Sequence, residues 1–308
     1  MNIRQIAAGD PQTALFLNTL LKYSPVLDKY IEFYTGAGTA SSDRKEQDAL
    51  TASGRALNSS YSAQVVAPEY NPVGRKIFGA QIKLDVAYEV MGMDIPSEFL
   101  SQLKREAIGL GTAFNNKLIN GDSATTATDF NGLKKLIQSA QIIEAAANGL
   151  EVQLGNDNTA KKSQQAFLEL LNDAIAMCSG VNKVILVNAK SISRITTIGR
   201  EYINWQLNEF GVPVGYYNQV PILNVEGNGN TIIPFTETQG SDLITGSLYV
   251  ASFEEKAGVS FFTTKEGLKV YPMTRENNFY DSHIDFIADS TLLRDKASIR
   301  LKGFRFSS

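Results

Sequence analysis

The sequence has one cysteine, Cys178, and one histidine, His283, among its 308 residues. A single cysteine excludes an intramolecular disulfide, and so few thiols and imidazoles exclude a zinc site built mainly from them. Cys178 ends an apolar helical pattern that begins at Phe167. We therefore expect a buried side chain that packs as a small hydrophobe and not a reactive thiol.

Long apolar runs are also missing. The sequence contains no stretch of roughly 18 consecutive apolar residues, which is what a membrane-spanning helix requires. The first ten residues lack the continuous apolar core of a secretion signal. We expect no membrane partner, and a protein that acts where it is made or in a particle assembled there.

An excess of positive charge is absent as well. The net charge is −3, and the chain is 43% hydrophobic and 20% charged, as in ordinary globular proteins. A protein that wraps tightly on DNA is expected to be basic. One that surrounds DNA without adhering to it should be neutral or acidic, because the phosphates repel it. The length allows one large domain or two modest ones.

The sequence singles out no set of catalytic residues. A Ser-His-Asp arrangement would have to use His283, which is next to Ser282 and on the same face of an expected strand as Asp285. A hydrolase that uses His283 is therefore the alternative from a different functional class. Serine, histidine and aspartate are often this close in a strand by chance, so the favoured interpretation is a structural histidine. The glycine pairs at positions 36/38 and 227/229 lack the context of phosphate-binding loops. We predict a protein that is not an enzyme, with no catalytic, cofactor-binding or metal-binding residues and no cofactor.

The N-terminal third begins with two short amphipathic segments and a long polar segment. Asp10-Pro11 is a typical helix start, and a second apolar set covers residues 27–34. Because neither segment has an obvious local core, we predict a docking arm. Residues 34–75 then form a long polar stretch, for which β-favouring residues at 61–66 indicate a two-stranded hairpin and Pro68 and Pro72 are expected to interrupt the ladder.

Charged residues flank and occupy this long segment. Basic pairs without interleaved aromatic residues do not resemble a nucleic-acid site, whereas they suit the rim of an interface between subunits. The candidate intersubunit contacts are Arg44, Lys45, Glu46, Arg55, Arg75 and Lys76.

The rest of the sequence predicts an α+β fold. Alternation predicts a strand over residues 81–90, and apolar spacing predicts a long helix from Pro96 to a left-handed end at Asn120-Gly121. Close neighbours are expected at Gly109 and Gly111. Further helices are predicted over 134–147, 163–178 and 189–199, the last capped by Asn188, and strands over 184–187, 221–225, 248–253, 268–271, 284–288 and 297–306.

Taken in order, these parts resemble the major capsid proteins of tailed bacteriophages, whose shell fold is also seen in herpesviruses and encapsulins. The motifs that carry the resemblance are Leu118-Ile-Asn-Gly-Asp122, Phe130-Asn-Gly-Leu133, Lys183-Val-Ile-Leu-Val-Asn188, Gln219-Val-Pro-Ile-Leu223, Arg275-Glu-Asn-Asn-Phe279 and Ile299-Arg-Leu-Lys-Gly303. The resemblance implies an N-terminal arm (1–33), an extended β-hairpin loop (34–79), a peripheral domain with a long spine helix (80–135 and 273–308) and an axial domain (136–272).

The resemblance implies a structural role. It predicts a virion subunit that is assembled in the host cytoplasm and forms pentamers and hexamers of itself in an icosahedral shell. The shell would enclose double-stranded DNA without sequence-specific binding, with scaffolding, portal and decoration proteins as further partners. The alternatives are an encapsulin-like compartment, which has the same fold but encloses protein, and another virion part such as a tail-tube or decoration protein.

Overall fold

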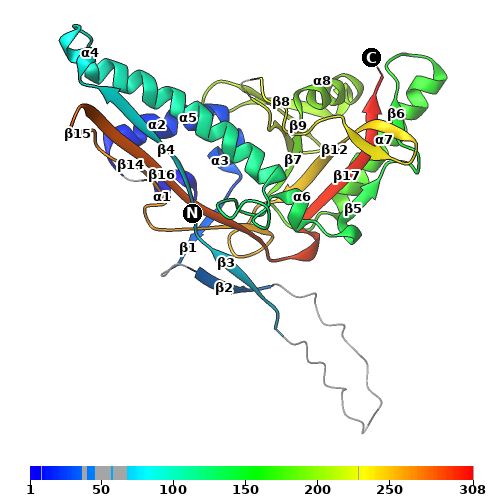
Figure 1. The fold of residues 1–308 in the computed structure, drawn as a ribbon. Helices are drawn as coiled ribbons and strands as arrows, with labels where there is room; N and C mark the ends of the chain where they lie inside the picture. Colours follow the sequence, from blue (N-terminus) through cyan, green and yellow to red (C-terminus); the bar gives the residue numbers. More distant parts are fainter. Residues whose placement is uncertain (8, 37–39, 46–56, 58–67, 228, 308) are drawn as a thin grey trace.

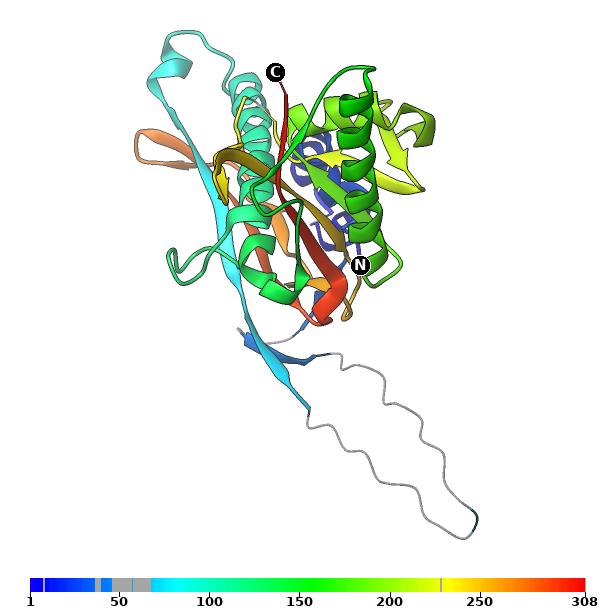
Figure 2. The ribbon, with the colours of Figure 1, turned by 90° about the vertical axis from the view of Figure 1, so that its right-hand side faces the viewer.

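The computed structural model describes residues 1–7, 9–36, 40–45, 57, 68–227 and 229–307. Two lobes lie side by side, and a narrow two-stranded hairpin extends away from both of them (Figure 1). In the view turned by 90° the hairpin again lies outside the body (Figure 2). Each lobe is built on its own β-sheet, so the mixed α+β class predicted from the sequence is confirmed.

The sheet of the first lobe has six strands arranged around one long strand, β16. Strand β4 runs antiparallel along most of β16, and the shorter strands pair with β16 or with its neighbour β13. The six strands are β1 (Phe33–Thr35), β4 (Lys76–Asp85), β13 (Val259–Thr263), β14 (Leu268–Val270), β15 (Thr274–Glu276) and β16 (Phe279–Leu292).

The strand predicted over residues 81–90 is displaced. Strand β4 ends at Asp85, and residues 87–90 form the short helix α4 (Ala87–Val90), in which Val90 is exposed. The physical reason is the partner strand: Asp85 pairs with Phe279, where β16 begins, so later residues have no ladder to join. The alternating burial of β4 agrees with the prediction only as far as Leu84.

The long helix α5 (Ile95–Asn120) crosses the face of this sheet (Figure 1). Its predicted apolar face is buried as expected, with Phe114 next to Phe78 of β4 at 6.2 Å between ring centroids. A Cβ at Gly111 would lie 3.3 Å from Leu20, so this glycine has the expected close neighbour, whereas nothing lies within 4 Å of a Cβ at Gly109. The predicted left-handed end is wrong, because φ of Gly121 is −56°.

The N-terminal helices differ from the predicted docking arm. They are α1 (Ile3–Ile6), α2 (Pro11–Tyr23) and α3 (Pro25–Lys29). The Asp10 side chain caps α2 by accepting from the Thr13 amide at 2.8 Å. Their apolar side chains, including Ile3, Phe16 and Leu20, are buried in the main core of the same chain. The body of this chain therefore supplies the core that the sequence of residues 1–33 lacks.

The second lobe contains a nine-stranded sheet with the helices α7 (Asn158–Met177) and α8 (Ala189–Ile198). Asn188 caps α8 as predicted, because its Oδ1 accepts from the Ser191 amide at 2.7 Å. The strands predicted over residues 184–187, 221–225, 248–253 and 297–306 are present, with somewhat different ends. The nine strands are β5 (Ile142–Glu144), β6 (Leu150–Val152), β7 (Lys183–Val187), β8 (Ile203–Leu207), β9 (Pro213–Tyr217), β10 (Val220–Asn224), β11 (Glu237–Gln239), β12 (Asp242–Ser252) and β17 (Ser298–Phe306).

The helix predicted over residues 134–147 is wrong beyond its first turn. Only α6 (Leu133–Leu136) is helical in the α sense, a 3-10 turn follows (Ser139–Gln141), and β5 then pairs with β17 in parallel. Short 3-10 turns also cover Arg200–Tyr202 and Asp295–Ala297. The edge of β17 offers backbone partners that override the helical spacing.

The sheets divide the chain differently from the predicted domains. Residues 259–270, expected in the axial domain, form β13 and β14 of the first sheet. Residues 298–306, expected in the peripheral domain, form β17 of the second sheet. Which sheet a strand joins is decided by hydrogen bonds to segments that are distant in the sequence, and the local hydrophobic pattern does not indicate these partners.

The hairpin consists of β2 (Ala40–Arg44) and β3 (Tyr70–Gly74), which pair antiparallel. Pro72 was predicted to interrupt the ladder. It instead lies inside β3 and pairs with Ser42, so the prediction is wrong for this proline. A two-stranded ribbon has free edges on both sides, where a missing N–H is tolerated. The β-favouring stretch at 61–66 lies outside the described residues.

Candidate functional site at the hairpin root

The hairpin joins the body through a small set of contacts that we call the hairpin root, formed by Asn71, Gly74, Asp289, Leu292 and their apolar neighbours. The Gly74 amide donates to Oδ2 of Asp289 at 2.8 Å. The Asn71 side-chain amide donates to the carbonyl oxygen of Leu292 at 2.8 Å. Both bonds join β3 to the end of β16, so they define where the hairpin leaves the body.

An apolar contact supports these hydrogen bonds. Val73, Tyr34 and Phe262 are buried together, with the rings of Tyr34 and Phe262 5.3 Å apart. The guanidinium of Arg75 lies 5.3 Å from the centroid of the Phe262 ring. This group forms a cluster separate from the two main cores, so the hairpin is attached to the body through a narrow contact.

Two ionisable side chains at the root, Asp289 and Tyr34, have raised pKa values. Burial raises the pKa of Asp289 above its ordinary value, against the opposing effects of the Ser290 and Gly74 amides and of Lys76. Burial, together with its hydrogen bond to Asp43, also raises the pKa of the Tyr34 hydroxyl. Tyr34 therefore acts as a neutral donor, and the Asp289 carboxyl group is the buried acid at the root whose pKa is raised.

Three candidate intersubunit residues have partners within this chain. Lys45 Nζ lies 2.7 Å from a carboxylate oxygen of Asp295, and the hydrogen bond to Asp295 is the main reason why the pKa of Lys45 is raised. Lys76 Nζ donates to the Ala127 carbonyl at 2.6 Å, and Arg75 donates to the Gly36 carbonyl.

The other candidates are placed only in part. Arg44 is exposed at the end of β2, opposite Tyr70. Glu46 and Arg55 lie outside the described residues. A role in contacts between subunits stays a prediction for all six candidates.

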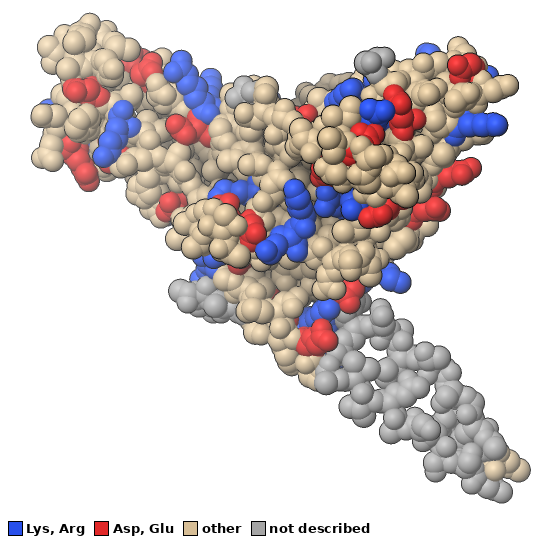
Figure 3. Space-filling model, turned by 45° about the vertical axis from the view of Figure 1, so that its right-hand side comes forward, with Lys and Arg blue, Asp and Glu red and all other residues tan. Residues whose placement is uncertain are grey.

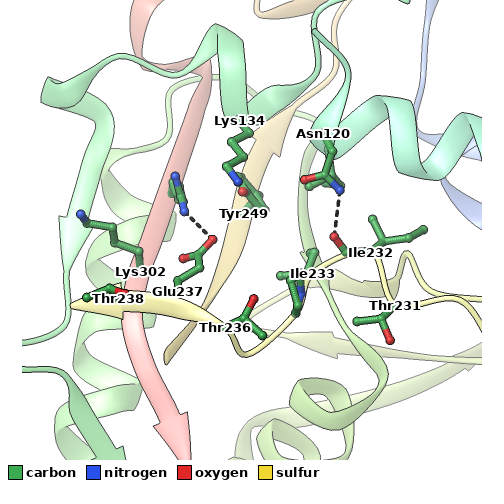
Figure 4. Close-up of a pocket in the computed structure, with 13 residues that line it drawn as sticks. Asn120, Lys134, Thr231, Ile232, Ile233, Thr236, Glu237, Thr238, Tyr249 and Lys302 are labelled. Atoms are coloured by element: carbon green, nitrogen blue, oxygen red, sulfur yellow. Dashed lines mark hydrogen bonds and ion pairs between the residues drawn. The ribbon is translucent and has the colours of Figure 1, made fainter. Parts of the chain in front are cut away.

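A polar cavity of about 540 Å³ lies where the end of α5 meets β17 and the segment 231–238 (Figure 4). Most of its charges are paired: Arg300 is 2.6 Å from Glu237, and Lys302 is 3.0 Å from Glu144. Lys134 has no ion-pair partner among the described residues. On the face shown in Figure 3, lysine and arginine side chains gather near the middle, with carboxylates beside them. The cavity is therefore lined mainly by polar side chains and by charges that are already paired.

Comparisons with known proteins match the whole chain in structure and none of it in sequence. No protein-family model matches the sequence, and no curated protein matches it either. The SrpI encapsulin of Synechococcus elongatus PCC 7942 is 11% identical, with a TM-score of 0.59 over 100% of this chain and 92% of that one. The chain has the shell fold of phage capsids and encapsulins.

Other solved structures agree. The capsid of the native GTA particle is 11% identical, with a TM-score of 0.58 over 93% of this chain and 90% of that one. The head of Helicobacter pylori bacteriophage KHP40 is also 11% identical, with a TM-score of 0.56 over 91% and 90% of the two chains. At such identities the likeness describes the fold.

Within this shell fold, His283 is not arranged as a catalytic base. Its ring is exposed and stacks on Tyr271, with centroids 3.9 Å apart. Ser282 is buried on the other face of β16, where its hydroxyl donates to the Tyr271 carbonyl at 2.6 Å. The serine and the histidine therefore point apart, and a hydrolase that uses this pair has no geometric support.

Cys178 is buried, as predicted, and its sulfur lies 3.4 Å from the Ala297 carbonyl oxygen. Burial raises the pKa of its thiol to about 12, so the reactive thiolate is suppressed. Among the described residues, no group of three or more His, Cys, Asp or Glu side chains is placed to hold a metal ion. Within the same part of the chain, no helix is both long and apolar enough to cross a membrane.

Sequence reasoning found the hairpin but missed its root. Asp289, Asn71 and Leu292 were not among the candidates, whereas the basic pairs that were chosen lie around them. The available signal was the presence of two carboxyl groups, Asp285 and Asp289, in the largely apolar stretch 284–293; an acid in such a stretch needs a specific partner when it is buried, as Asp289 is. The partner itself is 215 positions away and leaves no local trace.

Proposed function

We propose that this protein is a major capsid protein that assembles as pentamers and hexamers into an icosahedral shell around double-stranded phage DNA. The observation that carries the proposal is the shell fold over essentially the full chain, together with a hairpin that projects away from the body (Figures 1 and 2). Rings of identical subunits need a surface on one copy that fits a different surface on the next. A projecting hairpin supplies such a surface.

The construction of the hairpin supports a role in assembly. An isolated two-stranded ribbon is only marginally stable in water, because it has no second layer to cover it. Here one small buried cluster, Val73 with Tyr34 and Phe262, packs the described part of the hairpin against the body. Binding to a neighbouring subunit would stabilise the ribbon by mass action, which favours the assembled state.

Charge is consistent with enclosing DNA without binding it tightly. A net charge of −3 gives no overall attraction for phosphates, so the packaged nucleic acid would stay separable from the wall. In this proposal the protein is a non-enzymatic component of the virion and is assembled in the host cytoplasm. Scaffolding, portal and decoration proteins are the further partners.

An encapsulin-like compartment is the second candidate. The TM-score of 0.59 to the SrpI encapsulin and that of 0.58 to the GTA capsid do not separate the two functions. The contents of the particle do separate them. Nucleic acid inside particles purified from the native source supports the capsid, and enclosed protein without nucleic acid supports the compartment.

The hairpin can be shortened without disturbing its root. The Lys45 amide donates to the Glu69 carbonyl at 2.8 Å, so these residues lie opposite each other. We would replace residues 46–68 by Asn-Gly, which forms a tight turn between paired strands. The matched control replaces the same residues, 46–68, by a Gly/Ser segment of equal length, which keeps the chain length but removes the side chains.

Electron microscopy and light scattering then test the proposal. We expect closed shells, or rings of five and six subunits, from the unmodified chain. The shortened variant should fold with an unchanged melting temperature and form no closed shells. Normal particles from the shortened variant would refute the role of the hairpin. A chain that stays monomeric with a co-expressed scaffold would refute the capsid itself.

A further inference from the structure

The Asp289 carboxyl group lies between the body and the hairpin, and the residue as a whole is only 8% exposed. Its two oxygens have different donors: Oδ2 accepts from the Gly74 amide of β3, and Oδ1 accepts from the Ser290 amide of β16, both at 2.8 Å. One side chain therefore connects the rigid sheet to the first residue pair of the ribbon, where Gly74 faces Ala40. A buried carboxyl group is unfavourable unless it is hydrogen-bonded, so this contact is expected to be specific.

We propose that Asp289 is a positioning residue for the hairpin and couples the docking of β3 on the body to proton binding at its carboxyl group. When β3 is docked, the carboxyl group is shielded from water and bonded to Gly74. When β3 lifts away, the carboxyl group regains water and the Gly74 amide loses its acceptor. Further polar links across the root are the hydrogen bond from Asn71 to Leu292, the hydrogen bond from Tyr34 to Asp43, and the ion pair of Lys45 with Asp295.

The charged and titratable groups around Asp289 come from three elements. Lys76 of β4 favours the ionised carboxylate, although its amine is also bonded to the Ala127 carbonyl. Tyr34 of β1 is close enough to interact with Asp289, but its hydroxyl donates to Asp43 of the hairpin. Burial outweighs the amides and Lys76, and the pKa of Asp289 is raised from its ordinary value of 3.8.

The direction of the coupling follows from linkage. The docked state has the raised pKa, and the undocked state, in which water reaches the carboxyl group, has the ordinary pKa. The docked state therefore binds the proton more tightly. Docking is strongest below the ordinary pKa and weakens as the pH rises through the interval between the ordinary and the raised values.

Amide exchange of the peptide covering residues 71–75 measures this docking directly. The experiment uses unassembled, full-length subunits from below the ordinary pKa of 3.8 up to neutral pH, with rates corrected for the intrinsic pH dependence of exchange. The variants are Asp289→Asn, which keeps an acceptor but does not titrate, and Asp289→Ala, which removes the acceptor. Asp281→Asn is the matched control, because Asp281 is on the same strand but bonds to Gln81, away from the root.

We expect the protection of this peptide in the unmodified chain to fall as the pH rises, and the control to behave identically. Asp289→Asn should remove the pH dependence and keep the protection. Asp289→Ala should lose roughly fivefold or more in protection at every pH, because the Gly74 amide loses its acceptor whether the carboxyl group is protonated or not. The same pH profile in Asp289→Asn as in the unmodified chain would overturn the proposal. So would full protection in Asp289→Ala.

Two features keep the outcome interpretable. If Asp289→Ala does not fold, the comparison of the unmodified chain with Asp289→Asn still decides the question. The consequence for shell closure rests on the proposed function, but the exchange is measured on subunits. A chain that never forms shells would therefore refute the proposed function and leave the exchange result intact.

Discussion

Asn115 offers the sharpest test of how the body is held together. This side chain lies on α5, is 1% exposed, and bonds to two other parts of the chain. Its Oδ1 accepts from the Ser24 hydroxyl at 2.6 Å, at the end of α2. Its Nδ2 donates to the Val225 carbonyl at 3.1 Å, just after β10 of the second sheet. One amide therefore joins the N-terminal helices, the long helix and the second lobe.

The expected cost of Asn115→Ala follows from these bonds. Each buried partner left unsatisfied costs about 1–3 kcal/mol, although some of this is recovered by small rearrangements. The third bond, to the Tyr23 carbonyl, is longer at 3.3 Å and adds little. With two good bonds lost, we expect the free energy of unfolding to fall by about 2–4 kcal/mol. The slope of the denaturant dependence should not change, because the surface exposed on unfolding is the same.

Urea unfolding of unassembled subunits, followed by circular dichroism, measures this change. Asn116→Ala is the matched control, because Asn116 is the exposed neighbour on the same helix, and its effect should stay within about 0.5 kcal/mol. Ser24→Ala combined with Asn115→Ala should cost less than the sum of the two single changes, because both remove one shared bond. A loss below about 0.5 kcal/mol for Asn115→Ala, or strict additivity with Ser24→Ala, would refute the reasoning.

Three further predictions concern packing and ionisation. Gly79→Ala should destabilise the subunit by about 3 kcal/mol or more in thermal unfolding, because the added Cβ would lie 1.7 Å from the Ile284 carbonyl oxygen. Gly109→Ala is the control and should be neutral or slightly stabilising, because nothing lies within 4 Å of its added Cβ. Phe114→Ala should cost about 3–5 kcal/mol in urea unfolding, since the ring lies among four others, and Phe114→Leu should cost clearly less. In the folded state the pKa of the Cys178 thiol is about 12, whereas in the unfolded chain it is about 8.5. The contribution of the thiol to the free energy of unfolding is therefore fully present below about pH 8.5, and it falls above that pH because the unfolded thiol ionises while the folded one does not. The stability advantage over Cys178→Ala should therefore shrink by about 1.4 kcal/mol per pH unit above that point, and a constant difference would contradict the burial of the thiol.

The fold was predictable where periodicity and burial agree. The apolar spacing from Phe99 to Leu118 predicts α5, because one face of that helix is buried along its whole length. The short apolar run before Asn188 likewise predicts β7 and the capped helix that follows. In such segments the local pattern and the tertiary environment favour the same structure.

The errors arise where a distant partner decides the structure. The apolar residues at 136–143 have a spacing that fits a helix, but Ile142 and Ile143 pair with β17 instead. The alternation after Asp85 fits a strand, but β16 has no residues left to pair with it. The root was missed for the same reason, since Gly74 and Asp289 come together only in the folded chain. A single sequence shows the need for a partner and does not identify it.

The positions of Asn115 and Asp289 imply that stability and assembly can be changed separately. Asn115 lies in the main body, where its loss weakens the whole subunit but leaves the root untouched. Asp289 acts on the hairpin through one bond to Gly74, and the separate cluster at the root isolates that bond from the main cores. We therefore expect Asn115→Ala subunits to lose urea resistance yet form normal shells at low temperature. Asp289→Ala subunits should keep most of the cooperative stability of the body and close shells poorly. If both variants lose stability and assembly in proportion, the hairpin is part of the cooperative core, and the separation inferred from the root is wrong.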